Sequence, residues 1–167
     1  MATANKTNVE TSDRELIITR IFDAPRELVF ETCSDCKHLN NWWGPRTWPL
    51  SYCKMDFREG GSWHYCMSGP NEGDESWGLV KYHEIVEPEK IVYTDYFSDK
   101  DGNVNENMPE TLSAFVFSEQ GGKTKVTIRG EYKTPEDLRK VLEMGMVDGM
   151  GETLDRLEEH LEVLVSG

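Results

Sequence analysis

Hydrophobic and polar residues alternate along most of the chain with the two-residue period of β-strands. Seven segments combine this alternation with the β-branched and aromatic residues that strands favour: 16–22, 48–57, 62–67, 76–86, 90–97, 111–118 and 123–132. In the last of them Thr124, Val126 and Ile128 alternate with charged and polar neighbours. This pattern predicts a sheet with one buried face and one wet face.

Apolar residues recur instead every three or four positions near the end of the chain. Thr134 and Pro135 suit the start of a helix, and the apolar stripe then continues to Leu164 over about thirty residues. Two short helical segments are expected after the first strand, at 23–34 and 37–41. The long helix is the only predicted element long enough to cover the sheet.

These elements predict an α+β fold in which a curved, mostly antiparallel sheet of about seven strands wraps around one long C-terminal helix. The sheet cannot close on a single helix everywhere, so we expect a gap toward one end, roofed by the short helices and loops. Such a gap is where a ligand would bind. The predicted units are one domain over residues 13–165 and a flexible, polar lead over residues 1–12.

Charge and composition exclude several classes of protein. Lys and Arg number 18 against 31 Asp and Glu, a net charge of −13 that argues against binding to nucleic acid or to an anionic membrane surface. No apolar run is long enough to span a bilayer, and the start has no apolar core of a signal peptide. Four cysteines are too few for a disulfide scaffold, so the cytoplasm is the expected location.

Several segments, taken in order, resemble a known family. They are Phe22-Asp-Ala-Pro25, Leu39-Asn-Asn-Trp-Trp-Gly-Pro45, Met55-Asp-Phe-Arg-Glu-Gly-Gly-Ser-Trp63, Gly78-Leu-Val-Lys-Tyr-His-Glu-Ile85, Glu87-Pro-Glu-Lys-Ile-Val-Tyr-Thr94, Gly121-Gly-Lys-Thr-Lys-Val-Thr127 and Gly149-Met-Gly-Glu-Thr-Leu-Asp-Arg-Leu157. Together they resemble the helix-grip (START and polyketide-cyclase-like) superfamily, in the subgroup named after the activator of heat-shock protein 90 ATPase. The resemblance implies a helix-grip fold with a built-in cavity. It does not specify one function, because this fold serves lipid carriers, receptors, cyclases and co-chaperones.

Aromatic and methionine side chains are the strongest candidates for a ligand site. The predicted lining of an apolar pocket comprises Trp43, Trp63, Tyr65, Met67, Trp77, Tyr93, Phe115, Phe117, Met146 and Met150. For each of these residues, ordinary core packing is the competing interpretation.

Other chemistry is less well supported by the sequence. Cys33 and Cys36 form a CxxC near His38, which resembles half of a zinc site or a redox pair, but idle thiols are the simpler reading. The acidic loop 99–110 has calcium-like spacing but lacks the glycine at its sixth position. The histidines are weak candidates for a general base, since His64 is expected to face away from the pocket. No cofactor or metal is therefore predicted.

The leading functional hypothesis is non-catalytic binding of a small hydrophobic or aromatic molecule, including a lipid. A second hypothesis, implied by the resemblance, is a stress-response regulator that binds a chaperone ATPase through its acidic helix. A third is a polyketide-cyclase-like enzyme, which needs an ionisable residue inside the cavity. The sequence carries no signal for an oligomeric state.

Overall fold

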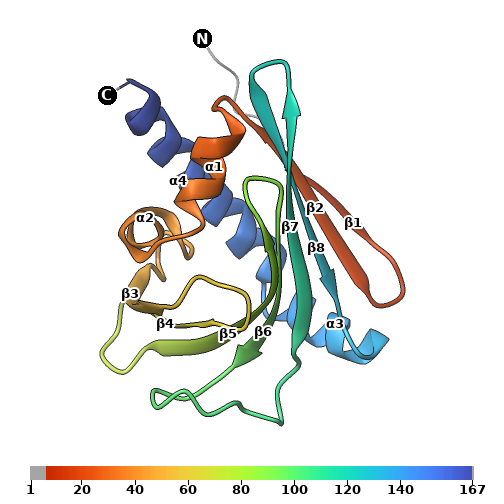
Figure 1. Ribbon diagram of the computed structural model, residues 1–167. Coiled ribbons are helices and arrows are strands. Elements are labelled where there is room, and N and C mark those ends of the chain that lie inside the picture. Colours follow the sequence, from red (N-terminus) through yellow and green to blue (C-terminus); the bar gives the residue numbers. More distant parts are fainter. Residues whose placement is uncertain (1–6, 167) are drawn as a thin grey trace.

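One antiparallel sheet and the helices on its concave side make up the computed structural model, which describes residues 7–166 (Figure 1). The sheet has the order β1-β2-β8-β7-β6-β5-β4-β3. Its strands are β1 (Asn8–Thr11), β2 (Glu15–Phe22), β3 (Leu50–Met55), β4 (Ser62–Ser68), β5 (Glu75–Val86), β6 (Lys90–Phe97), β7 (Thr111–Gln120) and β8 (Lys123–Glu131). The helices are α1 (Arg26–Thr32), α2 (Cys36–Trp42), α3 (Pro135–Glu143) and α4 (Met146–Ser166). The predicted α+β architecture is confirmed.

The sheet has one strand more than the sequence predicted. Asn8–Thr11, which we expected to belong to a flexible lead, form β1 and pair antiparallel with β2, from Asn8 opposite Thr19 to Thr11 opposite Leu16. All four residues of β1 are exposed, so this edge strand has no buried alternation that a pattern could reveal. Residues 1–6 of the expected lead lie outside the described residues.

The long C-terminal helix is also interrupted, which corrects the prediction of one continuous rod. Helix α3 ends at Glu143 and α4 begins at Met146. Between them Gly145 adopts a φ of 84°, and its N–H donates to the carbonyl of Leu142 at 3.1 Å. Glycine reaches this left-handed conformation without a steric penalty, so it commonly ends a helix. The break lets α3 lie at an angle to α4 (Figure 1).

The core lies between the concave face of the sheet and the part of α4 from Leu154 onward. Leu154, Leu157 and Leu161 of α4 are at most 3% exposed. On α1, Phe30 packs edge-on against Phe117 of β7, with ring centroids 5.3 Å apart. These contacts hold α1 and α4 on the same face of the sheet.

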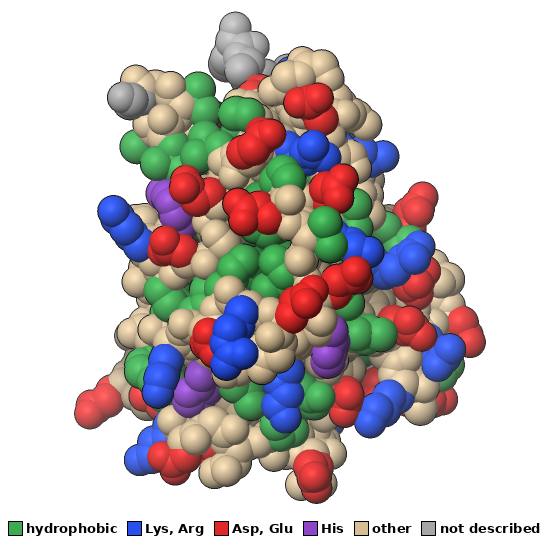
Figure 2. Space-filling view, in the orientation of Figure 1, with side chains coloured by type: hydrophobic (Ala, Val, Ile, Leu, Met, Phe, Trp, Pro, Cys, Tyr) green, Lys and Arg blue, Asp and Glu red, His purple; other side chains and the backbone are tan. Residues whose placement is uncertain are grey.

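Charged side chains cover much of the surface, with hydrophobic atoms between them on the face drawn in Figure 2. Several acids on the back of α4 are paired with arginines. Arg20 of β2 lies 2.7 Å from Asp155 and 3.3 Å from Glu158. Arg46, in the loop between α2 and β3, pairs with Glu159. In the described part of the chain, no helix is long and apolar enough to cross a membrane.

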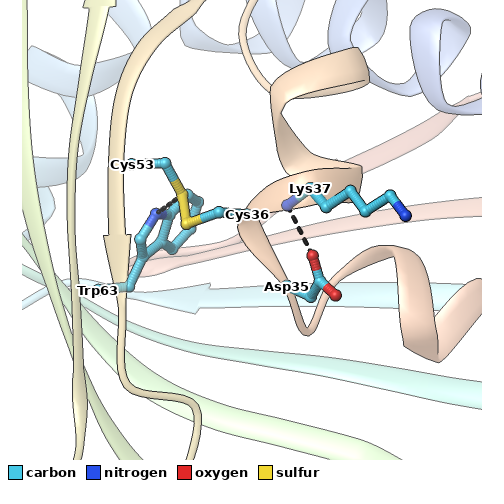
Figure 3. Close-up of a disulfide and its surroundings, with 5 residues drawn as sticks. All are labelled: Asp35, Cys36, Lys37, Cys53 and Trp63. Atoms are coloured by element: carbon cyan, nitrogen blue, oxygen red, sulfur yellow. Dashed lines mark hydrogen bonds between the residues drawn. A yellow bond between two sulfur atoms is a disulfide. The ribbon is translucent and has the colours of Figure 1, made fainter.

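A disulfide joins Cys36, the first residue of α2, to Cys53 in β3, with the two Cα atoms 5.8 Å apart (Figure 3). The indole N–H of Trp63 donates to Cys53 Sγ at 3.2 Å. The expectation of idle thiols is therefore wrong for these two cysteines, while Cys33 and Cys66 are free. The CxxC does not act as a pair, because Cys36 bonds to a cysteine in another element.

Loss of this crosslink should destabilise the fold, because the bond closes a loop between residues 17 positions apart. For a loop of this size we expect Cys36→Ser/Cys53→Ser to lower the free energy of unfolding by about 2–4 kcal/mol, measured by urea denaturation without reductant. Reductant should lower the stability of the unmodified protein by a similar amount and leave the double variant unchanged. Four free thiols in the purified, unreduced protein would contradict the crosslink.

Candidate functional site

A cavity of about 310 Å³ lies between the sheet and the first half of α4. Its existence follows from the sizes of the side chains on the helix. The first half of α4 and the residue before it present Gly145, Gly149 and Thr153 to the cavity, whereas the second half fills the core with leucines. Between these small residues and the facing sheet the interior keeps a hollow, which Met146 and Met150 of the same helix also line.

The structure brings most of the predicted site residues to this cavity. Its lining includes Trp43, Tyr65, Met67, Trp77, Tyr93, Met146 and Met150. Trp43 comes from the loop after α2, the next four from β4, β5 and β6, and the two methionines from α4. Binding of a ligand by these residues remains a prediction.

Three predicted residues lie elsewhere. Trp63 and Phe115 line a separate void of only about 20 Å³, and Phe117 packs in the core against Phe30. The indole of Trp77 does not point into the larger cavity: it packs against Tyr52 and His64, with centroids 5.3 and 5.0 Å away. These rings lie on the outer face of the sheet, so the indole of Trp77 is directed away from the cavity.

One functional candidate was missed by sequence reasoning. Asp95 of β6 lines the cavity, and the hydroxyl of Tyr65 donates to its two carboxylate oxygens at 3.1 and 3.3 Å. The sequence did contain a clue to Asp95. It follows Ile91 and Tyr93 at two-residue steps, so it lies on the same face of β6 as these buried residues. A charged residue within an apolar strand face is an unusual observation that points to function.

Burial raises the pKa of the Asp95 carboxyl to about 7, and the hydrogen bond from Tyr65 opposes this rise only in part. Burial, followed by the nearby charge of Asp95, also holds the pKa values of Tyr65 and Tyr93 well above their ordinary range. The two phenols therefore stay neutral near pH 7, and Asp95 is the group that changes charge there.

Glycine is required opposite Tyr65. Gly78 of β5 pairs with Tyr65 across the sheet, and a Cβ atom added at Gly78 would collide with the phenol ring. The missing side chain lets the ring lie over β5 with its hydroxyl directed to Asp95. This close approach places the polar pair inside the cavity.

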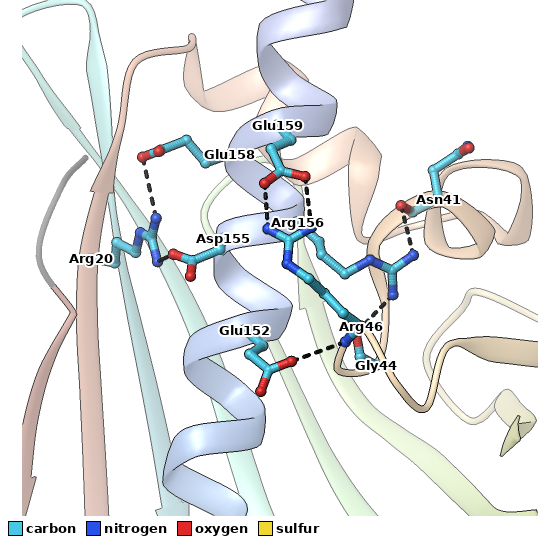
Figure 4. A network of polar contacts seen from close by, with 9 residues as sticks. All are labelled: Arg20, Asn41, Gly44, Arg46, Glu152, Asp155, Arg156, Glu158 and Glu159. Atoms are coloured by element: carbon cyan, nitrogen blue, oxygen red, sulfur yellow. Dashed lines mark hydrogen bonds and ion pairs between the residues drawn. The ribbon is translucent and has the colours of Figure 1, made fainter. Parts of the chain in front are cut away.

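Arginine side chains fix the rim of the cavity (Figure 4). Arg156 of α4 donates to the carbonyl oxygens of Gly44 at 2.8 Å, Trp43 at 3.2 Å and Asn41 at 3.1 Å. The backbone N–H of Arg46 donates to Glu152 at 3.2 Å. These bonds anchor the loop after α2 to α4, and Trp43 and Gly44 of that loop line the cavity.

The histidines lie outside this site. A ring nitrogen of His38 is 3.0 Å from one of His160, His64 contacts the carbonyl of Asp99 at 3.0 Å, and His83 contacts the hydroxyl of Thr94 at 2.6 Å. Within residues 7–166 no three His, Cys, Asp or Glu side chains gather as a metal site would require. In the acidic loop, Asp99 accepts hydrogen bonds from Asn103 and from the backbone of residue 101.

Comparisons with known proteins agree with the architecture. The model of the family described as "Activator of Hsp90 ATPase homolog 1-like protein" matches residues 23–162. A crystal structure of a protein from Mycobacterium smegmatis is 30% identical, with a TM-score of 0.85 over 93% of this chain and 96% of that chain. A solution structure of a protein from Arthrobacter aurescens is 28% identical, with a TM-score of 0.86 over 93% of this chain and 91% of that chain. No curated protein matches the chain.

Asp95→Asn should stabilise the protein in a pH-dependent way. Because the pKa of Asp95 is raised to about 7 in the folded state, from about 4 in an unfolded chain, the folded state holds a proton that the unfolded state has lost between these pH values. The contribution of Asp95 to the free energy of unfolding therefore falls as pH rises from 4 to 7. We expect Asn to raise the free energy of unfolding by roughly 1–4 kcal/mol at pH 8 and by much less at pH 5.

Urea denaturation at both pH values measures this difference. The matched control is Asp101→Asn, which removes the same charge from an exposed loop position. If the free energy of unfolding depended on pH equally in Asp95→Asn and in the unmodified protein, the raised pKa of Asp95 would be contradicted.

Replacement of Arg156 tests whether its hydrogen bonds hold the loop after α2 against α4. Arg156→Lys keeps the charge but cannot reach three carbonyls with one planar group, so we expect a loss of about 1–3 kcal/mol of stability. Arg46→Lys, at an exposed ion pair, should cost less than about 1 kcal/mol. Equal effects of the two substitutions in urea denaturation would show that the carbonyl contacts do not hold the loop.

Proposed function

The chain belongs to the activator of Hsp90 ATPase homolog 1-like family, and within that family we propose that it binds a small hydrophobic or aromatic molecule in the cavity beside α4. The observation that supports this most is the hollow of about 310 Å³ with its tryptophan, tyrosine and methionine lining. Ligand pockets typically have volumes of about 300–1,000 Å³. The cavity therefore suits a compact ligand, such as a two-ring aromatic, rather than a long lipid chain.

Binding would derive from burial of apolar ligand surface, at roughly 25 cal/mol per Å² before entropy costs. For a ligand of about a dozen heavy atoms, ordinary ligand efficiency gives a dissociation constant on the order of 10⁻⁵–10⁻³ M. The methionines Met146 and Met150 add adaptability, because their unbranched side chains refill irregular gaps.

A neutral probe tests this function without any contribution from charge. We expect 2-(1-naphthyl)ethanol to bind the unmodified protein saturably in isothermal titration calorimetry, with a negative heat-capacity change from apolar burial. Thr153→Phe should weaken binding at least tenfold, because the larger ring occupies the cavity that Thr153 lines.

The control for this variant is Val116→Phe, which adds a ring to an exposed position of β7, 37% exposed in the structure. It should bind the probe like the unmodified protein. Absence of saturable binding, or equal binding by both variants, would refute the proposed site.

The family name supports a second candidate, a partner-binding regulator of a chaperone ATPase. The surface first considered for that role is the acidic back of α4, and its residues Asp155, Glu158 and Glu159 already pair with Arg20 and Arg46. Fewer unpaired acids remain for a basic partner. Stimulation of a purified chaperone ATPase by this protein, lost on charge reversal along α4, is the measurement that favours this candidate.

A cyclase-like enzyme, the third hypothesis, needs an ionisable group inside the cavity, and Asp95 is such a group. Acid–base catalysis usually combines two groups with separated pKa values. Among the described residues that line the cavity, Asp95 is the only one that titrates near neutrality. We therefore favour binding over turnover.

A further inference from the structure

We propose that the cavity selects apolar ligands that carry a positively charged amine, and that the Asp95 carboxylate binds this amine. The inference rests on the proposed function, because it assigns a ligand class to the same cavity. It makes Asp95 a specificity-determining residue. It also disfavours the anionic fatty acids that an apolar cavity of this kind would otherwise accept.

The first support is the imbalance of charge inside the cavity. Asp95 is the only acid among the described lining residues, and none of those residues is Lys, Arg or His. Besides burial, the charge of Asp95 contributes to the raised pKa values of four phenols: Tyr65 of β4, Tyr82 of β5, Tyr93 of β6 and Tyr132 after β8. The lining residues of β2, β7, α3 and α4 carry no charge. Among the described residues that line the cavity, none is a cation that could neutralise the carboxylate.

The second support is unused hydrogen-bonding capacity. An ionised carboxylate can accept about four hydrogen bonds, and the Tyr65 hydroxyl, shared between the two oxygens, is its only side-chain donor in the described structure. A carboxylate in apolar surroundings is costly unless it is paired and hydrogen-bonded. A ligand ammonium group would provide the opposite charge and up to three donors at once.

The third support is the aromatic lining around the carboxylate. Trp43, Tyr93 and Tyr132 line the same cavity as Asp95. Aromatic faces attract cations, so they stabilise an ammonium group in addition to the apolar part of the ligand. An anionic ligand meets the opposite conditions: repulsion from Asp95, no cation in the lining, and a net protein charge of −13.

Three probes with the same naphthyl body separate charge from apolar burial. They are the cation 2-(1-naphthyl)ethylamine, the neutral 2-(1-naphthyl)ethanol and the anion 1-naphthylacetate, each titrated calorimetrically into the unmodified protein at pH 8. We expect the amine to bind at least tenfold more tightly than the alcohol, and the acetate to bind more weakly than the alcohol. Asp95→Asn should abolish the preference for the amine over the alcohol.

Two further measurements keep the inference open to refutation. Asp101→Asn, the matched loss of one exposed charge, should retain the full preference for the amine. In the unmodified protein, affinity for the amine should fall about tenfold from pH 8 to pH 6, because Asp95, with its pKa near 7, becomes largely protonated while the amine stays charged. Binding of the alcohol should not change over this range. The pH series uses only the unmodified protein, so it tests the inference even if Asp95→Asn folds poorly.

The outcomes distinguish the two proposals. If none of the three probes binds, the proposed function fails and the inference fails with it. If the alcohol binds but the amine binds no better at pH 8, or if Asp95→Asn keeps the preference for the amine, the inference is overturned and the proposed function stands.

Discussion

The size of the side chains along one helix determines where this protein is packed and where it is hollow. A curved sheet presents an apolar concave face, and α4 is the long helix that covers it. From Leu154 onward it carries Leu154, Leu157 and Leu161, which complete the core. Its first half presents Gly149 and Thr153 to a cavity of about 310 Å³. A residue of leucine size at those positions would convert the cavity into core.

The rest of the structure holds this arrangement in place. Arg156 binds three carbonyl groups of the loop after α2, and the Cys36–Cys53 bond ties the start of α2 to the sheet. Trp43 lies between these two anchors and packs edge-on against Trp63, with centroids 5.1 Å apart. The cavity thus has a rim that is fixed by hydrogen bonds and a covalent link, although its interior is under-packed. A preformed space of this kind lowers the entropy cost of ligand binding.

Asp95 gives the cavity its chemical character. Ionisation of a carboxyl in apolar surroundings opposes folding, because the charged form loses its hydration. The fold therefore accepts lower stability near neutral pH at the position where a ligand charge could restore it. Such a conflict between stability and local chemistry is typical of functional sites.

Local patterns predicted most of the fold, while contacts between distant segments were harder to predict. Two-residue alternation located β2 to β8, and the helical stripe located α3 and α4. The break at Gly145 was hidden because the apolar stripe continues through it, and β1 was hidden because an exposed edge strand has no alternation. Pairing of Cys36 with Cys53 depends on how α2 meets β3, which no local pattern encodes.

For the site, residue type alone identified aromatic candidates but not the direction of the Trp77 ring. Strand register decides that direction. The same register placed Asp95 inside the cavity, and its position two residues after Tyr93 was the available clue.

The central claim is that a carboxyl group lies in an apolar hollow beside α4, and the most direct test is the pKa of Asp95 in solution. Carbon-detected NMR of the protein labelled at the aspartate carboxyl carbons, with Asp95→Asn for assignment, follows this titration. A midpoint near 7 is predicted. A midpoint near the ordinary aspartate value of about 4 would place Asp95 in water and contradict the account.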